Sequence, residues 1–281
     1  MNQILACIDA SSYANSVIDL TIWAGKRLDA TVEILHVIQR KDAVAARHDL
    51  SGAIGLGSKA ELLEELTRID EAEGKIAKER GRILLAQAEQ LLKDGGLSDV
   101  HQMHRHGGIV ETIIEREAEA DLVILGKRGA SSEFATDHIG SKIERVVRAS
   151  DKPVLVAPLQ FTAPKSVVIA FDGSDAAQRA IELVLSSPLF AGLEVHLVMA
   201  GHHDTPHHQK LEAAAARFSI KPVVHHVDGR ADKAISTYMA EHPASILVMG
   251  AYGHSPLRTL IVGSTTTAMI RTVDAPVLLV R

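Results

Sequence analysis

The chain contains an internal repeat, which limits what it can fold into more than any other feature. Each copy opens with an apolar run that ends in Asp-x-Ser, at residues 4–11 and 167–174. Further matching features follow in the same order: apolar runs at 31–38 and 193–199, Gly-x-x-Gly at 126–129 and 250–253, Gly-Ser at 140–141 and 263–264, and Pro-Val-Leu at 153–155 and 276–278. The sequence therefore indicates a tandem duplication whose join lies near residues 158–164.

Short apolar runs alternate with helical patterns through both copies. The length of 281 residues suits two domains, and we expect them at 1–160 and 161–281. Unbroken, β-branched runs of this kind are typical of buried parallel strands. The alternation predicts an α/β fold of two tandem Rossmann-like domains, each a five-stranded parallel sheet with helices on both faces. In such sheets ligands bind at the carboxyl ends of the strands.

The amino-acid composition argues against several classes of function. Aromatic residues make up 3% of the chain and the net charge is −5, which disfavours both base stacking and a basic field for nucleic acid. The single cysteine, Cys7, allows no intramolecular disulfide, and we interpret it as a small core residue. No apolar run reaches the length of a membrane span, and no signal peptide precedes the first strand. We therefore expect a cytoplasmic protein.

The first half carries an insertion at residues 40–99. Residues 51–58 are rich in glycine, and 59–93 form a charged, helix-favouring stretch that ends at Gly95 and Gly96. We expect an amphipathic helix or helical pair that covers the sheet, with a lid or a partner-binding arm as the alternative. A thin apolar seam is provided by Leu62, Leu66, Ile69, Ile76 and Ile83, and the helix pattern is weakened by Gly74 and Gly81.

The closing strands of the two halves, at 154–156 and 277–280, are fully apolar. An exposed apolar edge strand is an aggregation hazard. The simplest solution is that these two strands pair with each other and join the two sheets. The chain would then be a built-in pseudo-dimer, and further pairing into a homodimer is left open.

The second half places glycines and hydroxyl groups where a phosphate could bind. Gly250-x-x-Gly253 follows a strand, and after nine further residues Gly263-Ser264-Thr265 opens a helix. A helix N-terminus offers free N–H groups, and glycine lets a phosphate approach the backbone. Asp172 ends a neighbouring strand at the same edge, where a carboxylate suits a ribose hydroxyl. The pattern is neither a Walker motif nor a dinucleotide fingerprint.

These residues, with the terminal Pro276-Val-Leu-Leu-Val, resemble the universal stress protein family, and the resemblance covers both halves. It implies a tandem member with adenine nucleotide alpha hydrolase-like domains, in a family whose single-domain members dimerise through the closing strand. In the ATP-binding branch of that family, Gly-x₂-Gly-x₉-Gly-Ser/Asn is the nucleotide signature. The resemblance implies that ATP, with Mg²⁺ as a potential companion, contacts Asp172 and Gly250 at the ribose, Val198 at the adenine, and Gly253, Gly263, Ser264 and Thr265 at the phosphates.

The first half departs from this pattern. Gly126-Lys-Arg-Gly129 is separated from Gly140-Ser141-Lys142 by ten residues rather than nine. Asp9 and Val37 match the ribose and adenine positions. The spacer contains Glu133 and Asp137, which would repel a triphosphate, whereas Lys127, Arg128 and Lys142 would attract it. We therefore expect the second half to be the better ATP site and the first half to be an altered one.

No catalytic motif is apparent, and we expect an ATP-binding regulator or binder of the stress response rather than a fast enzyme. His254, beside Gly253, is the candidate base for the first alternative, slow ATP hydrolysis or nucleotide hydrolysis more generally. The second alternative is a lipid-like ligand or a protein partner bound by the first half. Residues 202–208 hold four histidines that could bind a metal if they were helical, but Pro206 argues against a helix, and we expect a solvated loop without metal.

Overall fold

The computed structural model describes residues 2–39, 56–129, 141–201, 205–251 and 264–281. Within these ranges the first half contains β1 (Gln3–Cys7), α1 (Ala14–Leu28), β2 (Thr31–Ile38), α3 (Leu56–Asp94), β3 (Val100–His106), α4 (Ile109–Glu117), β4 (Leu122–Gly126), α5 (Ser141–Ala149) and β5 (Val154–Ala157). The second half contains β6 (Ser166–Ala170), α6 (Asp175–Ser186), the short helix η2 (Pro188–Phe190), β7 (Glu194–Ala200), α7 (Thr205–Ala215), β8 (Val223–Val227), α8 (Ala231–Glu241), β9 (Ser245–Gly250), α9 (Ser264–Thr272) and β10 (Val277–Val280).

The strands form one ten-stranded sheet in the order β3-β2-β1-β4-β5-β10-β9-β6-β7-β8. All pairs within each half are parallel. The two halves meet at an antiparallel pair, where Val277 lies opposite Val156 and Leu279 opposite Val154. Both closing strands are buried along their whole length, as their apolar sequences lead one to expect. The predicted fold class is confirmed: two tandem Rossmann-like halves with five parallel strands each.

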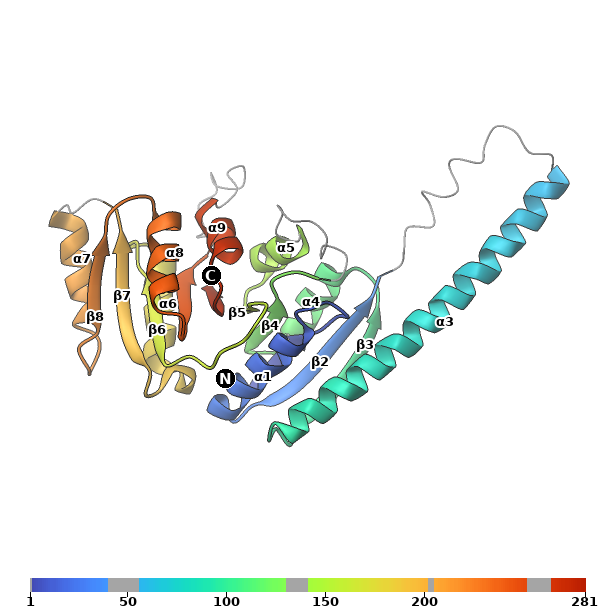
Figure 1. Ribbon diagram of the computed structural model, residues 1–281, viewed down its shortest axis with the longest axis horizontal. Helices are drawn as coiled ribbons and strands as arrows, with labels where there is room; N and C mark the ends of the chain where they lie inside the picture. Colours follow the sequence, from blue (N-terminus) through green and yellow to red (C-terminus); the bar gives the residue numbers. More distant parts are fainter. Residues whose placement is uncertain (1, 40–55, 130–140, 202–204, 252–263) are drawn as a thin grey trace.

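Helices cover both faces of the sheet (Figure 1). One apolar core lies between the strands and α1, α6, α7 and the last part of α3, with Leu20, Leu85 and Ile181 among its members. The other lies on the opposite face, beneath α4, α5, α8 and α9, and includes Ile113 and Met269. Each core continues through both halves, so the strand junction lies within continuous packing.

Helix α3 differs from the expected covering helix. It is one helix of 39 residues, and only its last part, beginning near Gly81, lies against β2, β3 and α1. Its earlier part extends beyond the sheet (Figure 1). The expected seam is therefore not buried: Ile69 is 46%, Ile76 52% and Ile83 44% exposed. The residues that do anchor the helix are Leu85, Ala88 and Leu92, because the strands end before they can reach the preceding turns.

Candidate functional site

Two aspartates lie where the central strands β1 and β6 end. Asp9 Oδ1 accepts a hydrogen bond from the backbone N–H of Ser11 (3.2 Å), and Asp172 Oδ1 accepts one from that of Ser174 (2.9 Å). Each carboxylate thus shapes the turn that leads into the following helix. The strands of Asp9 and Asp172 neighbour β4 and β9 respectively, so each aspartate lies at the same sheet edge as the glycine-containing segment of its half.

The glycine that ends each motif strand has a packing role. A Cβ atom at Gly250 would lie 2.7 Å from the backbone carbon of Ala176 in α6, and one at Gly126 would lie 2.8 Å from Cβ of Tyr13, which precedes α1. Because glycine has no side chain, the start of the following helix can pack closely against the strand end at both positions. Gly129 is crowded differently, because its Cβ would lie 2.7 Å from Asp9 Oδ2. The structure therefore brings Asp9, Gly126 and Gly129 together.

A pocket of about 710 Å³, including its open mouth, lies at the carboxyl edge of the first half. Its walls are mostly aliphatic, and its basic residues come from the end of β4 and the start of α5. The lining consists of Cys7, Ile8, Asp9, Leu35, Val37, Ile109, Ile113, Leu125, Gly126, Lys127, Arg128, Gly129, Lys142, Ile143 and Val146. The predicted first-half residues Asp9, Val37, Gly126 and Gly129 are all among them. Gly140 lies outside the described residues, and Ser141 begins α5.

Two residues that line this pocket have strongly shifted pKa values. Burial, supported by the nearby carboxylates of Glu33, Glu117 and Asp9, raises the pKa of the Cys7 thiol well above its ordinary range, so the thiol is uncharged. Burial also lowers the pKa of Lys127 to about 8, with Arg128 lowering it further and Asp274 opposing the shift. The Lys127 ammonium donates to the backbone carbonyl of Val273, 3.0 Å away. A first-half side chain therefore binds the carboxyl end of α9 in the second half.

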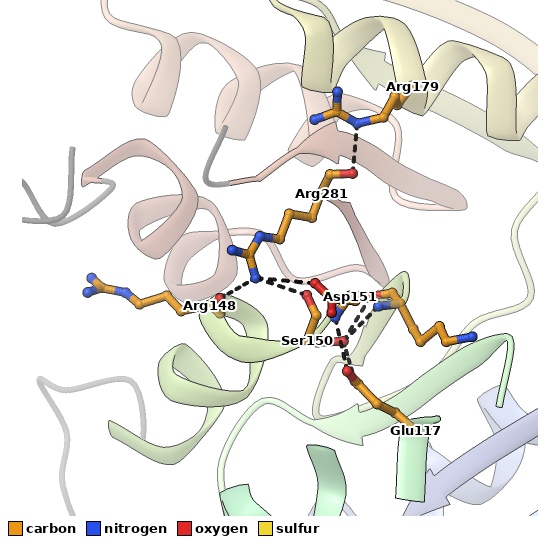
Figure 2. Close-up of polar contacts among 7 residues, drawn as sticks. Glu117, Arg148, Ser150, Asp151, Arg179 and Arg281 are labelled. Carbon is orange, nitrogen blue, oxygen red and sulfur yellow. Dashed lines mark hydrogen bonds and ion pairs between the residues drawn. The ribbon is translucent and has the colours of Figure 1, made fainter. Parts of the chain in front are cut away.

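Arg281, which follows β10, makes the reverse contact, from the second half to the first. Its Nη1 donates to the carbonyl oxygens of Arg148 (2.6 Å) and Ser150 (3.3 Å), at the carboxyl end of α5, and lies 3.8 Å from Asp151 Oδ1 (Figure 2). Glu117 fixes this corner by accepting hydrogen bonds from the Ser150 hydroxyl and the Asp151 N–H. Sequence reasoning missed Arg281 and the crossing of Lys127, because a single cation at a strand end forms no pattern.

The second half presents a polar hollow at the equivalent edge, lined by Arg230, Ala231, Asp232 and Thr265. Helix α9 begins at Ser264, as predicted, and the Thr265 side chain is exposed. The predicted residues Gly253, His254 and Gly263 lie outside the described residues. Of the predicted set, the structure thus places Asp172, Gly250 and the start of α9 at one sheet edge.

The strand register corrects one predicted equivalence. Cys7 lies opposite Leu35, and its counterpart Ala170 lies opposite Val198. Val198 therefore corresponds to Leu35, and the counterpart of Val37 is Ala200, two residues later. Val198 is fully buried and its carbonyl accepts from the N–H of Phe171. The equivalence of Val37 and Val198 is wrong: Thr31 lies opposite Gln3 and Glu194 opposite Ser166, so the two strands start in the same register, and their similar apolar sequences were matched two residues out of step.

The histidine-rich segment also differs from expectation. Helix α7 begins at Thr205, so Pro206 falls in its first turn. Backbone N–H groups in a first turn have no partner within the helix, so the missing N–H of a proline costs the helix no hydrogen bond there. His207 and His208 are therefore helical rather than part of a loop. His225 lies on β8. Among the described residues no group of three or more histidines, cysteines or carboxylates is arranged to hold a metal ion, and no helix there has the length and apolarity of a membrane span.

Comparisons with known proteins bear on the family and on the fold. The model of the universal stress protein family matches residues 1–158 and 197–281. A universal stress protein of Synechocystis sp. is 33% identical, with both chains covered completely. The crystal structure of a universal stress protein from Archaeoglobus fulgidus has a TM-score of 0.74 at 23% identity, covering 100% of this chain and 98% of that one.

A second solved structure, a putative universal stress protein from Pseudomonas aeruginosa, has a TM-score of 0.66 at 17% identity, covering 100% of this chain and 93% of that one. The two structural similarities concern the fold, and they extend over both halves. The family match and the full-length relative carry the assignment. This chain belongs to the universal stress protein family.

Proposed function

We propose that this protein binds ATP, with Mg²⁺ as a companion ion, at the carboxyl edge of the second half and acts as a nucleotide-dependent regulator in the stress response. The observation that carries the proposal is the convergence of three groups at one edge: the Asp172 carboxylate after β6, Gly250 at the end of β9, and the N-terminus of α9. A helix N-terminus favours phosphate, and a carboxylate favours ribose hydroxyls.

The surroundings of this edge support the same ligand. The hollow beside Thr265 is polar and includes the Arg230 guanidinium, which is held by Asp232 Oδ2 at 2.8 Å. The spacing Gly250-x-x-Gly253-x₉-Gly263 matches the nucleotide signature that the family resemblance implies. The register makes Ala200, rather than Val198, the residue proposed to contact the adenine through its backbone.

Calorimetric titration with ATP·Mg²⁺ tests this function. Asp172→Asn keeps an oxygen for the Ser174 N–H while removing the charge offered to ribose, and we expect at least tenfold weaker binding. Gly263→Val should abolish binding, whereas Gly140→Val and Asp9→Asn, the matched changes in the first half, should leave this affinity unchanged. Wild-type protein that is folded by circular dichroism yet binds no ATP would contradict the proposal.

The same samples distinguish binding from slow hydrolysis. Phosphate release that falls with His254→Ala while ATP affinity is preserved would favour the enzymatic alternative. If no turnover depends on His254, the protein binds ATP without hydrolysing it through this residue. A dimer formed through further pairing of whole chains is a separate proposal, which light scattering with and without ATP would test.

A further inference from the structure

A line of exposed isoleucines runs along α3, and the site proposed for ATP does not use it. In the described part of the chain, half of the large apolar side chains that are exposed belong to this helix: Ile69, Ile76, Ile83 and Leu91. The three isoleucines are seven residues apart, a spacing that drifts by only about 20° per repeat around an α-helix. They therefore form one line, about 21 Å long, which we call the isoleucine stripe.

The isoleucine stripe faces away from the core of its own chain. The buried residues that pack the last turns of α3 against the sheet are Leu85, Ala88 and Leu92. Because successive residues of a helix are about 100° apart, Ile83 lies almost directly opposite this buried face. Ile69 and Ile76 precede Gly81, near which α3 reaches the strands, and so belong to the part that extends beyond the sheet (Figure 1). Packing within one chain therefore does not explain the repeat, whereas a seven-residue apolar repeat is typical of a helix that pairs with another helix.

The charges on the exposed part of α3 are separated by sign. Residues 64–73 contain five carboxylates and one cation, Arg68, whereas residues 75–82 contain four cations and one carboxylate, Glu79. Arg68 and Glu79 each form an ion pair within their own segment. Two such helices packed side by side in parallel would bring like charges together. Antiparallel helices would instead place each acidic segment beside a basic one, which is the complementary arrangement.

We propose that the exposed part of α3 pairs antiparallel with the same part of a second copy of this chain, around a two-fold axis near Gly74 and Lys75. This axis sets residues 64–73 of each helix beside residues 75–82 of the other, and the two isoleucine stripes pack together out of water. The contact is isologous, so the same surface supplies both sides. The division of charge along α3 suits this partner, whereas a helix that lies on a membrane needs a basic polar face.

The pairing is separate from the site proposed for ATP, and it should be weak. Two helix segments of this length bury less than the roughly 1,200 Å² at which standard interfaces begin, so the dimer should dissociate on dilution. It should also weaken as the salt concentration rises, because charges on exposed segments are screened.

Sedimentation velocity of the full chain at rising concentration tests the pairing. We expect monomer at about 1 µM and mostly dimer at about 200 µM. Ile76→Glu, in the middle of the isoleucine stripe, should raise the dissociation constant about tenfold or more, because it buries a carboxylate in the contact. Ile220→Glu is the matched control, at an isoleucine that is 86% exposed and lies outside α3, and it should leave the dissociation constant within about twofold. Circular dichroism checks that both variants stay folded.

Charge reversal tests the antiparallel direction. An acidic variant carries Lys75→Glu, Lys78→Glu and Arg80→Glu. A basic variant carries Asp70→Lys, Glu71→Lys and Glu73→Lys. In each variant the two segments of α3 have the same sign, so each alone should self-associate at least tenfold more weakly than wild type. An equal mixture of the two should form dimers again, because every segment then lies beside one of opposite sign.

Three outcomes would overturn the proposal. A chain that stays monomeric at about 200 µM has no such contact, even if it binds lipid vesicles or another protein through α3. A dimer that Ile76→Glu leaves intact is formed by a different surface. Charge-reversed variants that self-associate as well as wild type would exclude the antiparallel pairing. Asp172→Asn separates this proposal from the nucleotide function, because it should weaken ATP binding and leave the dissociation constant of the dimer unchanged.

Discussion

At the scale of single residues, the two strand-ending glycines show how one position can carry both packing and a binding motif. The Cβ of an alanine at Gly250 would lie 2.7–2.8 Å from backbone and side-chain atoms of Ala176 and Ala177. At Gly126 the neighbour is Tyr13. Because the closest atoms at Gly250 include backbone, the helix α6 itself would have to shift. A glycine here is therefore required by the fold, whether or not a ligand binds.

Gly250→Ala should therefore destabilise the protein by about 1–3 kcal/mol through overpacking. Gly126→Ala should cost less, because side-chain atoms of Tyr13 can give way. Gly74→Ala is the control: its Cβ would meet no atom within 4 Å, and alanine is the better helix former, so no loss is expected. Urea unfolding measures all three, and equal stability of Gly250→Ala and wild type would contradict the packing role.

Lys127 gives a pH dependence of opposite sign to that of a lysine in a salt bridge, whose pKa the partner raises. Burial lowers its pKa from 10.5 to about 8, so between pH 8 and 10.5 the unfolded chain binds more protons at this residue than the folded one. Stability then rises with pH across that window. Below pH 8 the unfavourable burial of the charge is constant.

The free energy of unfolding of wild type relative to Lys127→Met should therefore increase between pH 8 and 10.5, by about 2–3 kcal/mol. Lys26→Met, at an exposed position on α1, controls for the general loss of a lysine. Denaturant titrations at four pH values provide the measurement. A wild-type advantage that stays flat, or falls with pH, would show that the Lys127 ammonium is not desolvated.

At the scale of elements, the last turns of α3 are buried against the sheet, whereas its earlier turns are exposed. Leu85 and Leu92 are each 1% exposed, whereas Ile76 is 52% exposed. In the earlier turns, side-chain pairs such as Arg68 with Glu64, at 3.0 Å, contribute only tenths of a kcal/mol. Most of the stability of this helix therefore arises from its last turns, which pack on the sheet.

Leu85→Ala should cost about 2–5 kcal/mol, because it leaves a cavity beneath the helix. Ile76→Ala, the matched change in the exposed part, should stay within about 0.5 kcal/mol in dilute, monomeric protein. Guanidinium unfolding followed by circular dichroism measures both. A large loss at Ile76 in dilute protein would mean that the exposed part of α3 packs within the monomer.

The sequence predicted the elements better than their ends. The apolar runs predicted β1, β2, β4 and β5 and their counterparts in the second half, whereas β3, with three histidines and an arginine, carries no such run; Gly95 and Gly96 marked the end of α3. The pattern could not show how far the sheet extends beneath α3, so an apolar seam was mistaken for a buried one. The register error at Val198 has a related origin: side-chain type is similar along a buried strand, whereas the backbone pairing that fixes equivalence is non-local. For the site, Asp9, Val37, Gly126 and Gly129 were predicted from the motifs, but the aliphatic residues that line the pocket were not identified, because they come from separate strands and helices.

At the scale of the whole molecule, the halves are joined by more than the pairing of β5 with β10. Lys127 binds the carboxyl end of α9, and Arg281 binds that of α5. Arg27 adds a contact from α1, with its Nε 2.6 Å from the carbonyl oxygen of Leu189 in η2. Cations at helix carboxyl ends interact favourably with the helix dipole. Each half thus supplies a cation to the last helix of the other.

Arg281→Ala should lower stability by about 1–3 kcal/mol, since it removes charged hydrogen bonds to two carbonyl groups. Arg281→Lys should recover part of the loss, because an ammonium lacks the planar fork of a guanidinium. The main-chain carbonyl that accepts from Arg179 is preserved in both variants. Differential scanning calorimetry, with exposed Arg271→Ala as control, makes the comparison. A melting temperature equal to that of wild type would show that the contact is not used in solution.

The antiparallel strand junction also has a consequence for how such a protein can change. In a dimer of identical chains, every substitution appears on both sides of the two-fold axis, so the two binding edges change together. Here a chain connection between Ala157 and Ser166 makes pairing intramolecular and insensitive to dilution. A substitution such as isoleucine at 143 where the other half has Thr266 then alters one edge only. Mutations can therefore change each binding edge separately, while the pairing of β5 with β10 keeps both edges in one molecule.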